Sequence, residues 1–167
     1  ITGCSKISEG CEHCYAERMA KRLKAMGNSN YKNGFSVTYH SNMLDKPISW
    51  KKSRLVFVNS MSDLFHEKVS LDQIKQIVDV MRKANWHHYQ ILTKRSERMM
   101  KLSKFITWPE NVWLGVSIEN QKYIHRIDDL QKINVGMRFI SFEPLIGEIS
   151  SFNTQGIGWV IVGGESG

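Results

Sequence analysis

The stretch Arg54-Leu-Val-Phe-Val-Asn-Ser60 contains a nearly continuous run of branched and aromatic residues that ends in two polar ones. Such runs are typical of strands buried on both faces of a parallel sheet. Ser70 then precedes a helical pattern of apolar residues, formed by Leu71, Ile74, Ile77, Val78 and Met81. The segment His88–Thr93 follows as a second strand. This part of the chain therefore predicts a strand–helix–strand unit with Ser70 as the helix cap.

The same alternation extends in both directions. Further strands are expected at 35–40, 112–118, 137–142 and 159–162, with helices at 15–26 and 120–132, a short helix capped by Ser96 and a helical turn within 44–52. Residues 146–158 show no convincing helix. Repeated βα units favour an α/β fold in which a parallel sheet forms a partial (β/α) barrel of the TIM-like type. An open doubly wound sheet is the alternative, because alternation alone does not separate the two.

Length and composition limit the kind of protein this is. The 167 residues suit a single α/β domain at 1–167, and 41% hydrophobic content suits a globular one. No run approaches the length of a membrane span, and reduced cysteines without a leader predict a cytoplasmic protein. The formal charge of +7 is consistent with a polyanionic partner. The start at Ile1 and the end at Gly167 predict truncation at both ends.

The three cysteines, Cys4, Cys11 and Cys14, all lie near the N-terminus. Three thiols without a fourth indicate a metal centre that keeps one coordination position open. An iron–sulfur cluster with one free iron fits best, because clusters take thiolate ligands from loops. A zinc site with a distant histidine as fourth ligand remains open, as does a disulfide plus one free thiol.

The helix expected after the cysteines shows an apolar stripe of Tyr15, Met19 and Leu23 with Ala16 and Ala20. Its basic residues are expected to face away from that stripe. Cys14 would then sit at a helix N-terminus, where the helix dipole favours thiolate charge.

The run Gly-Cys-Glu-His-Cys-Tyr-Ala-Glu resembles the cluster loop of radical S-adenosylmethionine (SAM) enzymes. The whole chain more closely resembles a phage-associated family of unassigned function built around a three-cysteine motif. The motifs that carry this resemblance are Thr2–Cys4, Gly10–Arg18, Met61–His66, Leu92–Arg95, Leu114–Asn120, Ser141–Leu145 and Gly163–Ser166. The resemblance implies a 4Fe-4S cluster on Cys4, Cys11 and Cys14, S-adenosylmethionine as a second cofactor and an electron donor as a partner. The six-then-two spacing of the cysteines departs from the spacing usual in radical SAM enzymes.

Polar residues follow the expected strands where each one ends. In a parallel sheet these ends share one edge, where ligands bind. The candidate cofactor-binding residues are Asp63, Lys94, Arg95, Ser117, Glu119, Asn120, Glu143 and Glu165, together with His13 in the cysteine loop. The radical SAM resemblance implies that an acidic member holds the SAM amine, that Lys94 or Arg95 meets its carboxylate, and that His13 lies near the adenine. Some of these residues are also expected to cap helices or to lie in solvated turns.

The function expected from this pattern is reductive cleavage of S-adenosylmethionine and hydrogen abstraction from a substrate. Lys94 and Arg95 at a strand end favour a nucleic acid or nucleotide-bearing substrate. The rival hypothesis is a nucleic-acid-binding module with a structural zinc or a non-catalytic cluster, which rests on the net charge and on the basic pairs Lys21–Arg22, Lys51–Lys52 and Lys94–Arg95.

Overall fold

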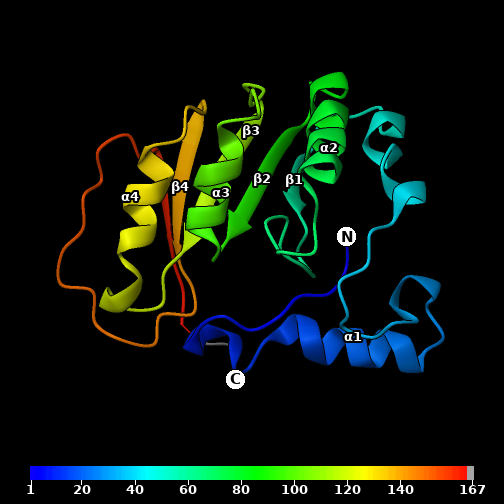
Figure 1. The fold of residues 1–167 in the computed structure, drawn as a ribbon, viewed down its shortest axis with the longest axis horizontal. Helices are drawn as coiled ribbons and strands as arrows, with labels where there is room; N and C mark the ends of the chain where they lie inside the picture. The colour runs from blue at the N-terminus through cyan, green and yellow to red at the C-terminus, as the bar shows by residue number, and fades with distance from the viewer. Residues whose placement is uncertain (165–167) are drawn as a thin grey trace.

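The computed structural model describes residues 1–164, and this part of the chain has an α/β fold around a five-stranded sheet (Figure 1). Its strands are β1 (Leu55–Val58), β2 (His88–Thr93), β3 (Val112–Ser117), β4 (Met137–Phe142) and β5 (Trp159–Val162). They lie side by side in chain order, and every neighbouring pair is parallel. The parallel α/β fold predicted from the alternating pattern is confirmed.

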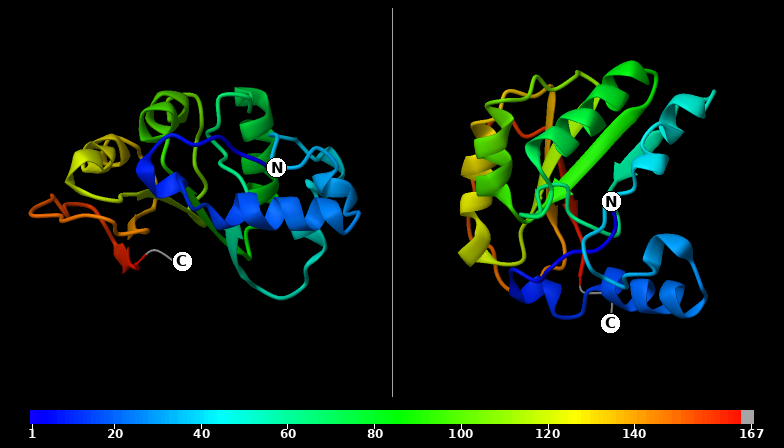
Figure 2. Two further views of the ribbon diagram at one scale, coloured as in Figure 1. Left: turned by 90° about the horizontal axis from the view of Figure 1, so that it is seen from below. Right: turned by 45° about the vertical axis from the view of Figure 1, so that its right-hand side comes forward.

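Each of the first three connections contains a helix. These helices are α2 (Leu71–Lys83), α3 (Ser96–Ser103) and α4 (His125–Gln131), the last preceded by a 3-10 turn at Gln121–Tyr123. All three helices cover the same face of the sheet (Figure 2). Right-handed crossovers between sequential strands place helices in this way, whereas a doubly wound sheet reverses its order and carries helices on both faces. The sheet is therefore singly wound and not doubly wound, with β1 and β5 as the two edges of the described sheet.

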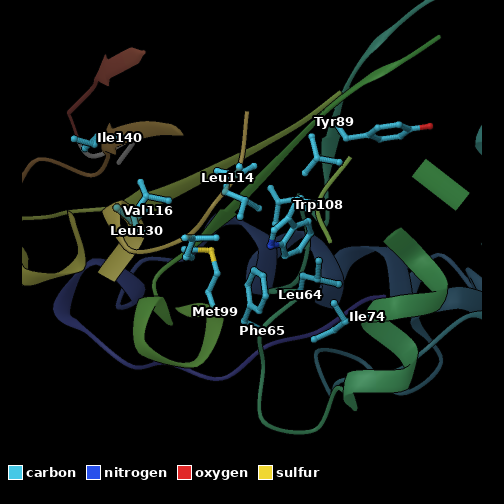
Figure 3. Packing of buried hydrophobic residues seen from close by; sticks show 14 of the residues in the cluster. Leu64, Phe65, Ile74, Tyr89, Met99, Trp108, Leu114, Val116, Leu130 and Ile140 are labelled. Atoms are coloured by element: carbon cyan, nitrogen blue, oxygen red, sulfur yellow. The ribbon is translucent and has the colours of Figure 1, made fainter. Parts of the chain in front are cut away.

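The core lies between the sheet and these helices (Figure 3). Tyr89, Ile91 and Leu114 project from neighbouring strands onto this face, because side chains alternate along each strand. They pack with residues of the helices and of the β1–α2 connection, including Ile74, Met99, Leu64 and Phe65. Trp108 closes the cluster, and its ring lies 6.4 Å from that of Phe65.

The opposite face of the sheet carries aromatic residues. The ring of Trp159 lies 5.8 Å from that of Phe139 and 6.2 Å from that of Trp113. Phe139 crosses over Gly115 so closely that an added Cβ there would lie 2.5 Å from its ring. Phe57 on this face is 47% exposed. The prediction that both faces of β1 are buried is therefore wrong, because β1 is an edge strand with helices on only one side.

Several local predictions can be compared with the structure. Ser70 caps α2, as predicted, and the structure shows that it does so in a reciprocal capping box with Gln73. Ser96 does not cap α3, because it lies inside the helix and its hydroxyl donates to Asp129 at 2.7 Å. Residues 35–40 form no strand but only an isolated bridge between Thr38 and Thr2. The predicted turn at 44–52 is a 3-10 helix at Lys46–Ser49, which follows another at Ser41–Met43, and residues 143–158 contain no helix.

Helix α1 (Tyr15–Ala25) lies across the edge of the sheet toward which the strands point (Figure 1). Its Ala16 and Ala20 are buried, but Tyr15 and Met19 are exposed. The predicted apolar stripe is therefore only partly buried, because α1 rests on loops and not on the sheet. No helix within residues 1–164 is long and apolar enough to cross a membrane.

Candidate functional site

The cysteine loop is attached to the carboxyl edge of the sheet by backbone hydrogen bonds. Gly3 donates its N–H to Met61 O at 3.0 Å, and Cys4 donates to Phe35 O at 3.2 Å. Gly3 has a φ of 83°, and an added Cβ would lie 2.4 Å from Ser36 O. Only glycine fits this close approach without displacing backbone. The loop then passes through a 3-10 turn at Glu9–Cys11 and enters α1 at Cys14.

The three cysteines line one cavity of about 180 Å³ at this edge. All three thiols are free and half-buried. The ends of the strands provide the cavity floor through Phe57, Leu92 and Ser117. The fold thus brings together the three residues that were proposed as metal ligands.

The arrangement of the thiols bears on which metal they fit. Among residues 1–164, no three His, Cys, Asp or Glu side chains converge closely enough to hold a single ion. A tetrahedral zinc needs such convergence, since its ligand bonds are about 2.0–2.3 Å long. Thiolates of an iron–sulfur cluster bind separate irons and stand around the cluster. Three free thiols around one cavity are the kind of ligand set that an iron–sulfur cluster takes.

Cys4 is the thiol with the most distinctive surroundings. Burial raises the pKa of the Cys4 thiol and the Asp63 carboxylate raises it further, while Arg95 acts in the opposite direction. Nη1 of Arg95 lies 3.6 Å from Cys4 Sγ and donates to it. Cys11 Sγ lies 3.8 Å from the Ser8 hydroxyl. Arg95 is a charged donor of the kind that stabilises a ligating thiolate.

Arg95 lies beneath the cysteine loop and is bound by protein acceptors. It is 7% exposed and pairs with Asp63 at 3.1 Å and with Glu67 at 3.0 Å. Asp63 is equally occupied, because it also accepts from the Thr93 hydroxyl at 2.8 Å and from the Phe65 N–H at 2.9 Å. These two predicted cofactor-binding residues therefore form an internal ion pair in this structure.

Glu119 forms the second buried charge network. Its side chain is fully buried and accepts from Nη1 of Arg126 at 2.7 Å, and Nζ of Lys94 lies 3.8 Å away. The Ser8 hydroxyl also donates to Glu119. Gly10 lies so close that an added Cβ would be 2.5 Å from the Glu119 side chain. Through its contacts with Ser8 and Gly10, Glu119 therefore fixes the part of the cysteine loop between Cys4 and Cys11.

A second cavity of about 360 Å³ adjoins the first. Its lining includes His13, Lys94, Ser117 and Glu143 among the predicted cofactor residues. Cys14, Lys94 and Ser117 line both cavities, so the cysteine cavity and its neighbour share a wall. Glu143 is exposed and accepts from the Ser141 hydroxyl at 3.2 Å. The second cavity is therefore lined by polar side chains next to Cys14.

The remaining predicted residues have other positions. Asn120 caps the turn at Gln121–Tyr123 by accepting from the Lys122 N–H at 3.0 Å, so it serves the local backbone. Glu165 lies outside the described residues 1–164.

Three residues of the site, Ser5, Ser8 and Arg126, were not singled out from the sequence. Ser5 and Ser8 lie in the cysteine loop and contact Arg95 and Glu119, and Arg126 also contacts Glu119. His66, which contacts Ser5, was named only as the end of the Met61–His66 motif and as one of the distant histidines for a zinc site. For Arg126, only tertiary structure shows that its guanidinium reaches Glu119 and Ser117 O from α4.

Comparison with known proteins gives a family but no characterised relative. A search of curated proteins and a search of solved structures each returned no significant match. One family model matches residues 1–167, and its description is a protein of unknown function, DUF5131. The chain therefore belongs to the DUF5131 family.

Proposed function

We propose that this protein is an iron–sulfur enzyme of the radical SAM type. The supporting observation is that its three free cysteines surround one cavity at the carboxyl edge of a parallel sheet. This edge is where parallel α/β folds bind their ligands. The resemblance of the Gly10–Arg18 segment to radical SAM cluster loops supports the same reading.

Cys4, Cys11 and Cys14 would hold three irons of a 4Fe-4S cluster and leave the fourth open. When bound, the cluster and S-adenosylmethionine supply reductive cleavage of the sulfonium and hydrogen abstraction from a substrate. The protein contributes orientation through the loop contacts of Glu119 and Arg95 and shielding through the half-buried cavity. An external electron donor is required as a partner.

The adjoining cavity is the proposed place for S-adenosylmethionine. Glu143 there has the charge to hold the amine, and His13 at the mouth has an aromatic ring suited to the adenine. Lys94 is 19% exposed by its side chain and lines both cavities, so it is the candidate for the carboxylate. Arg95 is not a candidate for the carboxylate, because its guanidinium forms ion pairs with Asp63 and Glu67.

The proposed substrate is a nucleic acid or a nucleotide-bearing molecule. Of the predicted phosphate contacts, Arg95 is engaged in an ion pair with the buried Asp63, and Lys94 is the residue proposed above for the SAM carboxylate. Helix α1 begins at Tyr15, which lines both cavities, and its exposed basic residues Arg18, Lys21 and Arg22 offer an alternative. We therefore assign the phosphate contacts to α1.

Anaerobic reconstitution tests the proposal. Wild-type protein should bind about four irons, turn brown and release 5′-deoxyadenosine from S-adenosylmethionine when reduced. The Cys4→Ala/Cys11→Ala/Cys14→Ala variant should lose the iron and keep its circular dichroism spectrum, because the sheet core does not include the loop. Equal iron in both proteins would contradict the cluster assignment. A colourless wild-type protein with one zinc would favour the nucleic-acid-binding module.

A further inference from the structure

The guanidinium of Arg95 contacts the cysteine loop at a ligand and at its neighbour. Nη1 donates to Cys4 Sγ at 3.6 Å, and Nη2 donates to Ser5 O at 3.1 Å and to Ser5 Oγ at 3.0 Å. Nη1 also donates to Asp63 at 3.1 Å, and Nε donates to Glu67 at 3.0 Å. The planar fork of arginine makes these contacts together, which a single ammonium does not.

Ser5 is held from a second direction by His66. Nδ1 of His66 accepts from the Lys68 N–H at 3.1 Å, so the ring proton lies on Nε2. Nε2 is 2.8 Å from Ser5 Oγ and donates to it. Ser5 Oγ therefore accepts hydrogen bonds from both Arg95 and His66. These two bonds fix the position of the backbone next to Cys4.

The three cysteines differ in the hydrogen-bond donors that reach their sulfur atoms. In the part of the chain that the structure describes, Cys11 has only the Ser8 hydroxyl at 3.8 Å, and no hydrogen-bond donor reaches Cys14 Sγ. Cys4 alone has a charged donor. Hydrogen bonds and positive charge at a cluster thiolate stabilise the reduced, more negative state and raise the reduction potential.

We propose that Arg95 is a positioning residue for the Cys4 ligand and that its N–H raises the reduction potential of the cluster. The inference rests on the proposed iron–sulfur site and is independent of S-adenosylmethionine. The competing role is that of a buried ion-pair partner for Asp63, which would affect stability and leave the potential unchanged.

The test compares Arg95→Lys with wild type as anaerobically reconstituted protein. Redox titration followed by electron paramagnetic resonance should give a lower midpoint potential for Arg95→Lys, measured on the iron-loaded fraction. Arg95→Met, which also removes the charge, should shift it further in the same direction. Should Arg95→Met fail to fold, the lysine variant alone decides. An unchanged potential in Arg95→Lys would overturn the proposal.

Two control variants distinguish a specific effect of Arg95 on the reduction potential from a general effect of destabilising the protein. Arg98→Lys makes the same exchange one turn along α3, where Arg98 contacts Val69 O and no cysteine, and it should leave the potential unchanged. Asp63→Asn removes a negative charge beside Cys4 and should shift the potential upward. Shifts of the same sign in Asp63→Asn and Arg95→Lys would contradict the assigned roles.

A second measurement does not require the cluster. Hydrogen–deuterium exchange of the apo-protein should be about tenfold faster in the segment around Cys4 and Ser5 in Arg95→Lys, which is the factor expected for loss of one charged hydrogen bond. Wild type that binds no iron would refute the proposed function, and this exchange rate would still decide whether Arg95 holds the loop. Equal exchange in both proteins would refute that role.

Discussion

At the scale of single residues, the site depends on two buried charge networks beneath the cysteine loop. Glu119 is fully buried and joins Arg126 on α4 to Ser8 in the loop, while Arg95 joins Asp63 to Ser5. Burial lowers the pKa of Arg126, and Glu119 opposes that effect. Buried ions of this kind are tolerated only when each charge is paired, so both networks should be sensitive to small changes.

Replacing Glu119 with Gln should destabilise the protein strongly. The substitution keeps the shape but leaves Arg126 buried without a counter-charge, which costs about 3–5 kcal/mol. The free energy of unfolding from urea denaturation measures this loss. Glu97→Gln is the matched control, because Glu97 pairs with Lys101 on the surface of α3 and should change stability little. Equal losses in the two variants would show that Glu119 is not a structural anchor.

At the scale of elements, the strands were easier to predict than the helices that surround the site. In β2 the residues that face the helices are Tyr89, Ile91 and Thr93, and the alternation of strands places them on one side. Helix α1 shows the opposite case. Its apolar pattern predicts a helix and correctly includes the buried Ala16 and Ala20, but its partner is a set of loops, so Tyr15 and Met19 of the same pattern are exposed.

The alkaline stability of the protein should depend on Tyr89. Burial raises the pKa of Tyr89 to about 12, and its hydroxyl donates to Ala84 O. The unfolded state loses its proton near pH 10, so the contribution of Tyr89 is fully present below pH 10 and is lost as the pH rises toward 12. Melting temperatures between pH 9 and pH 12 should therefore fall less steeply for Tyr89→Phe than for wild type. An equal slope in wild type and Tyr89→Phe would contradict this account.

At the scale of the whole molecule, the carboxyl edge of the sheet, two cavities and the basic helix α1 lie together. The sequential strand order produces this arrangement, because every strand points to the same edge and every crossover helix stays on one face. The loop of Cys4 to Cys14 and α1 then cover that edge (Figure 2). A substrate that reaches the cavities would therefore pass beside α1.

Binding to single-stranded oligonucleotides should depend steeply on salt if α1 contacts phosphates. Replacing Arg18, Lys21 and Arg22 with Ala removes three charges and should reduce the log–log salt slope by about 2. Lys51→Ala/Lys52→Ala removes charges outside α1 and outside the lining of both cavities and should leave the slope unchanged. Identical slopes in wild type and the α1 variant would remove the support for a phosphate-bearing substrate.

The sequence by itself determined the parallel α/β fold, the bounds of β4 and β5, Ser70 as the cap of α2 and the presence of three thiols in one loop. These features follow from local periodicity and from residue type, which act over a few neighbouring positions. Tertiary structure decided which strand is an edge and which charged residues face the cavities. Lys94 and Arg95 are adjacent in sequence, yet one lines both cavities beside Glu119 and the other lies buried against Asp63 and Cys4. Pairing of this kind depends on residues about 25 to 90 positions away, so no local pattern contains it.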